Sequence, residues 1–148
     1  GIGDYPQSKV RFGGSYGSAF LYYMIPRIIL FRPDHNARVL VPKVDFISAT
    51  GTSAPGVWRR GGPHALVTGK GVFSFDRTAG RFTLMSIHPG ESLEGIREAT
   101  GFDYDVAAEL QETEAPNAEM LDLIRGEVGT EIAATYPKFA RETLGVSI

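Results

Sequence analysis

Short hydrophobic runs separated by turn residues cover the first two thirds of the chain. They predict strands at residues 9–12, 27–32, 44–47, 64–68, 72–76 and 81–87, with a final edge strand at 102–105. The run at 27–32 is bulky and β-branched, which favours a buried strand. The turns at 69–71 and 77–80 leave no room for crossover helices, so the three strands between 64 and 87 are expected to pair antiparallel.

Helical signals lie on both sides of these strands. Ser92 is placed to cap a helix at 92–100, and Gly101 is expected to end that helix in the left-handed conformation. One or two helical turns are expected at 18–25, before Pro26 stops them. The remaining predicted helices span 117–126 and 131–144, the second with a kink or restart at Pro137. A sheet with helices before and after it predicts a mixed α/β architecture.

Composition is typical of a globular protein. Of 148 residues, 43% are hydrophobic and 22% are charged, and the formal net charge is −2. That balance gives no reason to expect nucleic acid, and no Lys/Arg run indicates a membrane surface. The chain has no cysteine, which excludes a disulfide framework, a thiolate nucleophile and a cysteine metal site. A cytoplasmic location is expected, because it is compatible with the absence of disulfides.

Export and membrane signals are weak. The longest apolar stretch, residues 19–31, contains Pro26 and Arg27 and is too short for a transmembrane helix. No basic segment followed by a cleavable apolar run opens the sequence, so no signal peptide is expected. The sequence begins Gly1-Ile2-Gly3-Asp4 rather than with Met, a pattern typical of the interior of a protein, and further sequence upstream is expected.

Several segments resemble one enzyme family in a single order along the chain. They are residues 44–47, 62–68, 71–76, 80–84, 86–92 (Ser86-Ile87-His88-Pro89-Gly90-Glu91-Ser92), 99–102, 116–121 and 123–125. Together they resemble the β subunits of class I coenzyme A-transferases, particularly the glutaconate CoA-transferase type. The resemblance fades past Gly129. Residues 1–129 are therefore predicted to be the C-terminal portion of a β-subunit domain, and residues 130–148 a helical C-terminal extension.

The resemblance implies an α/β CoA-transferase fold with a mixed sheet flanked by helices. It also implies a homologous α subunit as partner, usually in an α2β2 assembly, together with the upstream half of the β subunit. Members of the family move CoA between acyl groups through a glutamyl-CoA thioester, so coenzyme A is a substrate and no permanently bound cofactor is expected. The nucleophilic glutamate lies in the upstream half. No glutamate of this chain resembles it, so no catalytic residue is assigned here and the chain alone is expected to be inactive.

Three other functions stay open at this point. Relatives with this architecture hydrolyse a carbon–carbon bond in a ring-containing CoA thioester, or decarboxylate a glutaconyl-type thioester, after losing the nucleophilic glutamate. The chain could alternatively be a non-catalytic binding or assembly subunit, since it carries no recognisable nucleophile or metal cluster. The residue at the nucleophile position, upstream of this sequence, would discriminate between transfer and the two lyase or hydrolase reactions.

A glycine-rich segment is the first candidate site. Gly13, Gly14, Ser15, Tyr16 and Gly17 fall where the family has a glycine-rich loop beside the active site. Closely spaced glycines let backbone N–H groups approach a thioester oxygen or a carboxylate, and a following helix N-terminus adds positive potential. The segment departs from the family pattern at its tyrosine, and again at Ser18 and Phe20. A tight turn between a strand and a helix needs the same glycines.

The second candidate site follows the predicted strand at 44–47. Ser48, Thr50 and Gly51 could present hydroxyl and amide groups to a ligand at the end of that strand, although a turn stabilised by local hydroxyl bonds is the simpler explanation. Further along, Trp58 could stack on adenine while Arg59 and Arg60 bind CoA phosphates. Solvated surface or a subunit contact is the interpretation favoured for that tripeptide.

The histidines and the remaining charges predict no further site. His88 could act as a base, but a buried, hydrogen-bonded histidine beside a Pro-Gly turn is favoured. His35 lies in a predicted turn and His64 opens a strand, and neither has a second ligand at metal spacing, so no metal is expected. Asp103 and Asp105 would share one face of the edge strand. Lys9, Arg11 and Arg27 are interpreted as ordinary surface charge, and the aromatic cluster at residues 19–24 as core or subunit interface.

Overall fold

The computed structural model describes residue 7 and residues 16–146, which form two compact units. The first unit ends at Thr113 and the second begins at Glu114. The candidate strand at 9–12 and the residues Gly13, Gly14 and Ser15 lie outside the described part of the chain. The boundary predicted at residue 129 marks where the sequence resemblance fades, and it stays a prediction.

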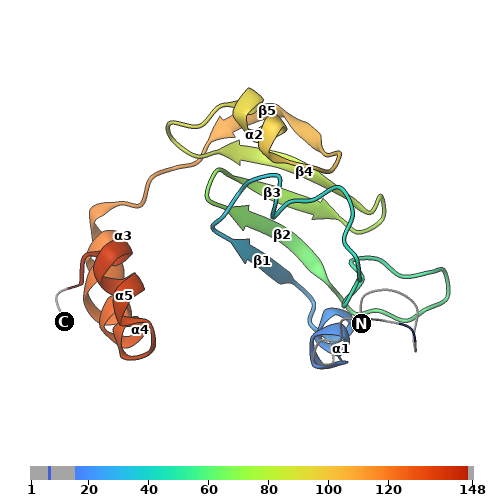
Figure 1. Ribbon diagram of the computed structural model, residues 1–148, viewed down its shortest axis with the longest axis horizontal. Coiled ribbons are helices and arrows are strands. Elements are labelled where there is room, and N and C mark those ends of the chain that lie inside the picture. Colours follow the sequence, from blue (N-terminus) through green and yellow to red (C-terminus); the bar gives the residue numbers. More distant parts are fainter. Residues whose placement is uncertain (1–6, 8–15, 147–148) are drawn as a thin grey trace. The chain divides into compact units, whose positions relative to one another are not determined.

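A five-stranded sheet forms the first unit, with strands in the spatial order β1-β2-β3-β4-β5 (Figure 1). The elements in chain order are α1 (Tyr16–Met24), β1 (Ile28–Arg32), β2 (Pro63–Thr68), β3 (Gly71–Asp76), β4 (Arg81–Ile87), α2 (Leu93–Ala99) and β5 (Asp105–Glu112). The meander β2-β3-β4 is antiparallel, as the short turns predict. Both outer pairs, β1 with β2 and β4 with β5, are parallel, which makes the sheet mixed.

The core lies on the central three strands. Leu66 of β2 pairs with Phe73 of β3, and Phe73 pairs with Leu84 of β4, so one buried side chain comes from each strand in a row. Ile96 of α2 completes the cluster, and it is fully buried together with the phenylalanine and Leu84. The Ser92 side chain accepts a hydrogen bond from the amide of Gly95 and caps α2, as predicted.

Strand β1 differs from the prediction of a buried strand. Among the described residues it pairs with β2 alone, and the side chains of Ile29 and Phe31 are 64% and 70% exposed. Its apolar sequence therefore marks a sheet edge whose hydrophobic side chains are uncovered within the described residues. The predicted strand at 44–47 is also wrong: this segment is irregular, and Val44, Phe46 and Ile47 are all exposed.

Two details after α2 also correct the sequence analysis. Gly101 is not left-handed, because the helix ends at Thr100 in extended geometry, with the Gly101 amide bonded to the carbonyl of Leu40. The last strand begins at Asp105, not at 102, and pairs parallel with β4. Residues 102–104 instead lead into that strand, because the segment after a helix must return along the sheet before it can pair parallel.

The second unit is helical. It contains α3 (Ala118–Leu123), a π-helical segment η1 (Ile124–Val128), α4 (Gly129–Thr135), α5 (Pro137–Phe139) and a second π-helical segment η2 (Ala140–Leu144). The Asn117 side chain caps α3. The helix restarts at Pro137, as predicted. Among its described residues, Gly129, Ala140 and Val146 are buried. None of the helices in the described residues is long and apolar enough to cross a bilayer.

Candidate functional site

The glycine-rich candidate is described only at its end. Tyr16 and Gly17 are the first two residues of α1, so this helix begins directly inside the predicted loop. α1 is nine residues long and continues to Met24, and Pro26 then prevents further helix. Because the backbone amides of a helix N-terminus have no partner within the helix, this arrangement suits the predicted anion contact.

The other end of α1 is held by a distant segment. The amides of Arg60 and Gly61 donate to the carbonyl of Tyr23, and the amide of Gly62 donates to the carbonyl of Ile25. Gly61 has to be a glycine, because a Cβ atom there would overlap the backbone of Ile25 and Pro26. The carbonyls that a helix end leaves free are therefore satisfied by the residues that lead into β2.

We call this contact between the end of α1 and the residues before β2 the junction. Arg59 lies at its centre. Its Nε donates to Ser53 Oγ at 2.8 Å, and its Nη1 donates to the carbonyls of Tyr22 at 3.0 Å and Gly61 at 3.4 Å. Its Nη2 donates to the carbonyl of Thr50 at 2.8 Å, to the hydroxyl of Thr50 at 3.1 Å and to the carbonyl of Thr52 at 3.2 Å. The guanidinium therefore bonds to the protein itself, which differs from a solvated surface arginine and occupies the N–H groups that a CoA phosphate would need. A subunit contact of this segment stays a prediction.

One predicted site residue, Thr50, belongs to this junction. Its hydroxyl lies 3.4 Å from the hydroxyl of Tyr23, and the Arg59 guanidinium lies 4.2 Å from the centre of the Tyr23 ring. Hydrogen bonds with Thr50 and Ser53, with a smaller contribution from the Arg59 charge, lower the pKa of Tyr23. We call Tyr23, Thr50, Ser53 and Arg59 the Arg59 cluster. A phenol with a lowered pKa is a better hydrogen-bond donor. The cluster places this phenol and two other hydroxyl groups beside the fixed positive charge of Arg59.

The neighbours of Thr50 take different roles. Ser48 is exposed on irregular backbone, and no strand precedes it, so the predicted presentation at a strand end is wrong. Gly51 packs against β3: a Cβ atom there would lie 3.1 Å from the ring of Phe75. Trp58 and Arg60 remain on the surface, with the tryptophan 65% exposed, and a ligand or subunit contact for them stays a prediction.

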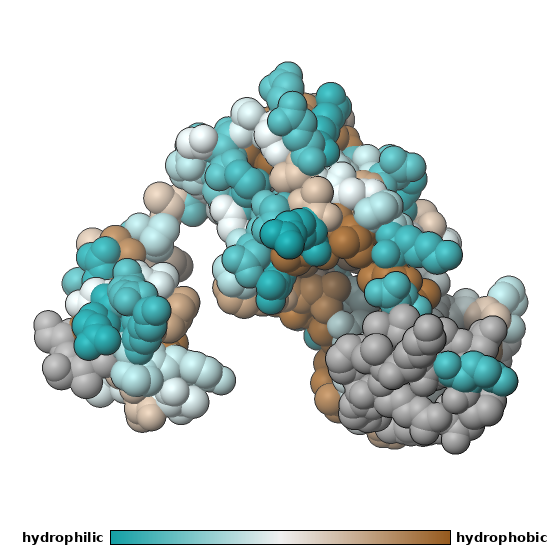
Figure 2. All heavy atoms as spheres, in the orientation of Figure 1, coloured by the Kyte–Doolittle hydropathy of each residue, from teal (hydrophilic) through white to brown (hydrophobic). Residues whose placement is uncertain are grey.

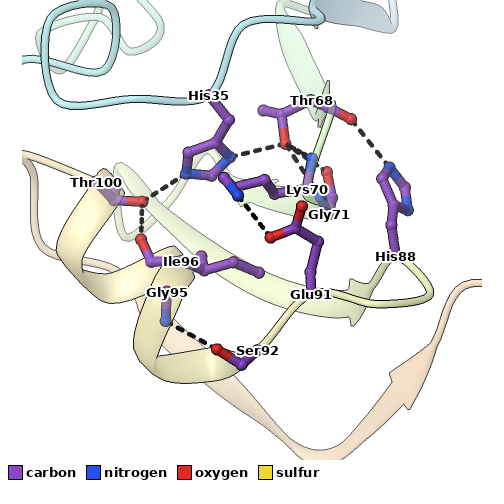
Figure 3. Close-up of polar contacts among 10 residues, drawn as sticks. All are labelled: His35, Thr68, Lys70, Gly71, His88, Glu91, Ser92, Gly95, Ile96 and Thr100. Atoms are coloured by element: carbon purple, nitrogen blue, oxygen red, sulfur yellow. Dashed lines mark hydrogen bonds and ion pairs between the residues drawn. The ribbon is translucent and has the colours of Figure 1, made fainter.

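A second polar network lies between the sheet and α2 (Figure 3). The buried ring of His35 bonds through Nδ1 to the hydroxyl of Thr68 at 2.9 Å and through Nε2 to the hydroxyl of Thr100 at 2.8 Å. Thr100 donates its proton to the carbonyl of Ile96, so Nε2 of His35 donates to Thr100. In the neutral ring Nδ1 then accepts from the Thr68 hydroxyl, which also lies 3.0 Å from the carbonyl of Gly71. We call His35, Thr68 and Thr100 the His35 network. The network could not be found from the turn predicted at His35, because the partners of His35 are 33 and 65 residues away.

His88 is a structural residue, as favoured from the sequence. Its Nε2 donates to the carbonyl of Thr68 at 2.9 Å, and its Nδ1 lies 2.8 Å from the hydroxyl of Thr113. Both ring nitrogens therefore make hydrogen bonds, as favoured from the sequence, although the ring is half-buried and not buried. His64 of β2 is exposed. Within residues 7 and 16–146, no group of three or more metal-ligating side chains could hold a metal ion.

A small hollow of about 290 Å³ lies beside α2 and the start of β5. It is lined by Arg97, Thr100, Phe102, Asp103, Tyr104 and Val106. The hydroxyl of Tyr104 is buried there without a hydrogen-bond partner, and burial raises the pKa of this phenol. Asp103 and Asp105 do not share a strand, because β5 starts at Asp105, which pairs with Arg81 at 2.8 Å. The expectation that the two aspartates share one face of an edge strand is therefore wrong.

The His35 network makes stability depend on pH. Burial is the main cause of the lowered pKa of His35, the nearby Lys70 lowers it further, and Glu91 partly opposes them. The unfolded chain then binds more protons than the folded one below about pH 6.5, so stability is lost as pH falls from there towards the lowered pKa. We expect the urea concentration at the unfolding midpoint to decrease as the pH is lowered from 7.5 to 5.5. Replacing His35 by Gln should reduce this slope, and replacing the exposed His64 by Gln should leave it unchanged; an equal slope in both variants would contradict the assignment.

Two of the relatives that match this sequence are B subunits of coenzyme A-transferases. The chain is 36% identical over 134 residues to the B subunit of glutaconate CoA-transferase from Acidaminococcus fermentans, an alignment that covers 86% of this chain and 49% of the relative. It is 30% identical over 130 residues to the B subunit of 3-oxoadipate CoA-transferase from Pseudomonas knackmussii, covering 84% and 50%. No family model matches the sequence.

Solved structures with the same arrangement include enzymes with different names. Glutaconate coenzyme A-transferase from Acidaminococcus fermentans superposes with a TM-score of 0.65 at 33% identity, over 85% of this chain and 50% of that one. The decarboxylase AibA/AibB gives 0.64 at 30% identity, over 83% and 47%. IpdAB of Rhodococcus jostii RHA1 gives 0.70 at 27% identity, over 84% and 51%.

The mixed sheet and its helices define the α/β CoA-transferase fold over the matched region. The chain is homologous to the B subunits of glutaconate and 3-oxoadipate coenzyme A-transferases. It spans about half the length of the curated relatives that it matches.

Proposed function

We propose that this chain is part of a heteromeric coenzyme A-transferase that moves CoA between an acyl-CoA and a free carboxylic or dicarboxylic acid. The observation that carries the proposal is the 36% identity to a glutaconate CoA-transferase B subunit over 86% of this chain. A second B subunit, from a 3-oxoadipate CoA-transferase, matches nearly the same share of the chain. The names of these two relatives suggest that the enzyme accepts short acids as acyl groups.

In this proposal the residues of the described chain bind and orient the substrate. The N-terminal residues of α1, Tyr16 and Gly17, and the residues Thr50 and Gly51 contact the CoA thioester, and the covalent nucleophile is a glutamate in the other half of the subunit. Coenzyme A is then a substrate, and no permanently bound cofactor is required. We also propose that the chain corresponds to the C-terminal half of the B subunit and that the enzyme works in the cytoplasm.

The surface of the first unit supports a partner. Phe20 and Leu21 of α1 and Ile29 and Phe31 of β1 are between 49% and 70% exposed, and Figure 2 shows hydrophobic surface in this part of the molecule. Exposed apolar patches normally mark interfaces. We propose that the remaining half of the B subunit and a homologous A subunit cover them, in an α2β2 assembly with interfaces above about 2,000 Å². A cooperatively folding, monodisperse monomer of the isolated chain in ultracentrifugation would contradict this assembly.

Trapping of the covalent intermediate tests the activity. The complete complex is incubated with an acyl-CoA and then with borohydride, which reduces a glutamyl thioester and leaves a modified glutamate for mass spectrometry. We expect that modification, together with exchange of CoA into an isotopically labelled free acid. Absence of both the adduct and the exchange would overturn the proposal.

The structural likeness to AibA/AibB and IpdAB gives the test a second outcome, which is decarboxylation or hydrolysis of an acyl-CoA. If the complex releases CO₂ from an acyl-CoA, or opens a ring in one, without any exchange into free acids, then the fold serves a decarboxylase or a hydrolase. The residue at the nucleophile position of the complete subunit gives an independent readout. A glutamate agrees with transfer, and a Ser, Cys or Ala contradicts it.

A further inference from the structure

Arg59 uses its whole guanidinium group within the protein. Its three nitrogens make six contacts with oxygen atoms, four of them backbone carbonyls, at 2.8 to 3.4 Å. A guanidinium has five N–H groups, so none is left for a phosphate or a carboxylate of a ligand. The role of Arg59 must therefore lie in what it holds together.

Arg59 connects two segments that are distant in sequence. The carbonyl of Tyr22 lies in α1, 37 residues before Arg59. The acceptors of Thr50 and Thr52 lie in the loop that directly precedes Arg59 in the sequence. The neighbouring amides of Arg60 and Gly61 bond to the carbonyl of Tyr23 and strengthen the same junction. Both of the segments proposed to contact the thioester, the start of α1 and Thr50–Gly51, belong to elements that this one side chain joins.

The chemistry of the junction requires arginine. A positive charge at the C-terminal end of a helix is favourable, and hydrogen bonds from a charged donor to carbonyl oxygens are stronger than neutral ones. The planar fork of a guanidinium reaches acceptors on both sides of the loop, whereas a lysine offers one nitrogen. The contact with the ring of Tyr23 at 4.2 Å adds a cation–π interaction.

We propose that Arg59 is a positioning residue for the CoA transfer. It holds α1 and the Thr50 loop in one fixed arrangement, so that the groups on both elements meet the thioester in a constant geometry. This inference rests on the proposed function, and it assigns to Arg59 no contact with the substrate. Displacement of positioning groups by about 1 Å can cost about a hundredfold in rate.

The test compares variants of Arg59 in the complete complex with a matched surface arginine. For Arg59→Met and Arg59→Lys we expect kcat to fall about ten- to a hundredfold, with the KM for acyl-CoA changed less than about twofold, because substrate binding is retained and the reacting geometry is not. Lys should not rescue, since it lacks the fork. Ser53→Ala, which removes the acceptor of Nε and the hydrogen bond to Tyr23 but leaves the guanidinium in place, should fold normally and lower kcat about two- to fivefold. Arg77→Met, at an exposed position in the turn between β3 and β4, serves as the control with unchanged kcat.

Amide hydrogen exchange on the same samples supplies a readout that does not depend on activity. Exchange at Arg60, Gly61 and Gly62, whose amides bond to α1 and the residues after it, should accelerate in Arg59→Met and stay unchanged in Arg77→Met. Unchanged exchange, full rescue by Lys, or a rise in KM with kcat intact would each overturn the inference. If the wild-type complex transfers no CoA, the proposed function fails, and the exchange result still decides whether Arg59 holds the two segments.

Discussion

Replacing Phe73 by alanine should lower the free energy of unfolding by about 3–5 kcal/mol, the usual cost of removing a buried phenylalanine from a core. The side chain of Phe73 is 0% exposed and is the middle member of the row formed by β2, β3 and β4. Its ring centre lies 5.3 Å from that of Tyr104 and 6.4 Å from that of Phe82, both in edge-to-face orientation. Truncation would leave a cavity under all three strands, and urea denaturation of the purified protein measures the loss.

The same substitution at an exposed phenylalanine is the control. Phe46 is 60% exposed on irregular backbone, so Phe46→Ala should change the unfolding free energy by less than about 0.5 kcal/mol. If the two variants lose similar stability, the packing described for Phe73 is wrong. A change in the slope of the urea transition, without a shift of its midpoint, would point instead to a change in the denatured state.

Thr68→Val should destabilise the protein by about 2–4 kcal/mol, although the two side chains have nearly the same shape. Thr68 is 3% exposed, and its hydroxyl accepts hydrogen bonds from the amides of Lys70 and Gly71 and bonds to Nδ1 of His35 at 2.9 Å. Valine fills the same space but leaves these buried polar groups without a partner. The cost of a buried, unsatisfied donor exceeds the gain from one additional methyl group.

Thr83 provides the matched control for that substitution. It lies half-buried in the neighbouring part of the sheet, on β4, where its hydroxyl is not part of the His35 network. Thr83→Val should be close to neutral, since valine is favoured on strands. A Thr68 variant as stable as the Thr83 variant would mean that the network contributes little. Calorimetric unfolding of both proteins at pH 7.5, where His35 is neutral, makes the comparison independent of protonation.

Local sequence was sufficient to predict much of the fold. The turns at 69–71 and 77–80 and the strands around them were found from alternation and glycine positions, since the pairing of a meander depends on neighbours in sequence. The cap of α2 and the restart at Pro137 were also predicted, because a capping serine and a proline act within a few residues. The ordered resemblance to CoA-transferase β subunits was confirmed by the relatives and the solved structures.

Elements that depend on distant partners could not be predicted in the same way. The apolar run at 28–32 has the composition of a buried strand, but only the order of strands decides whether a strand is central or at an edge. The run at 44–47 alternates as a strand does, yet it is irregular and exposed within the described residues. Alternation specifies which residues share a face and does not supply the neighbouring strand.

For the candidate site, too, the sequence and the tertiary structure decided different points. The sequence by itself determined the resemblance to CoA-transferase β subunits, because that resemblance rests on motifs in one order along the chain. The site residues at Tyr16–Gly17 and Thr50–Gly51 stay predictions. Only the tertiary structure decided that Arg59 faces inward and that His35 is buried. Those two outcomes depend on carbonyl and hydroxyl groups brought from 37 and 65 residues away, and a polar side chain can be buried only where the fold supplies its hydrogen-bond partners.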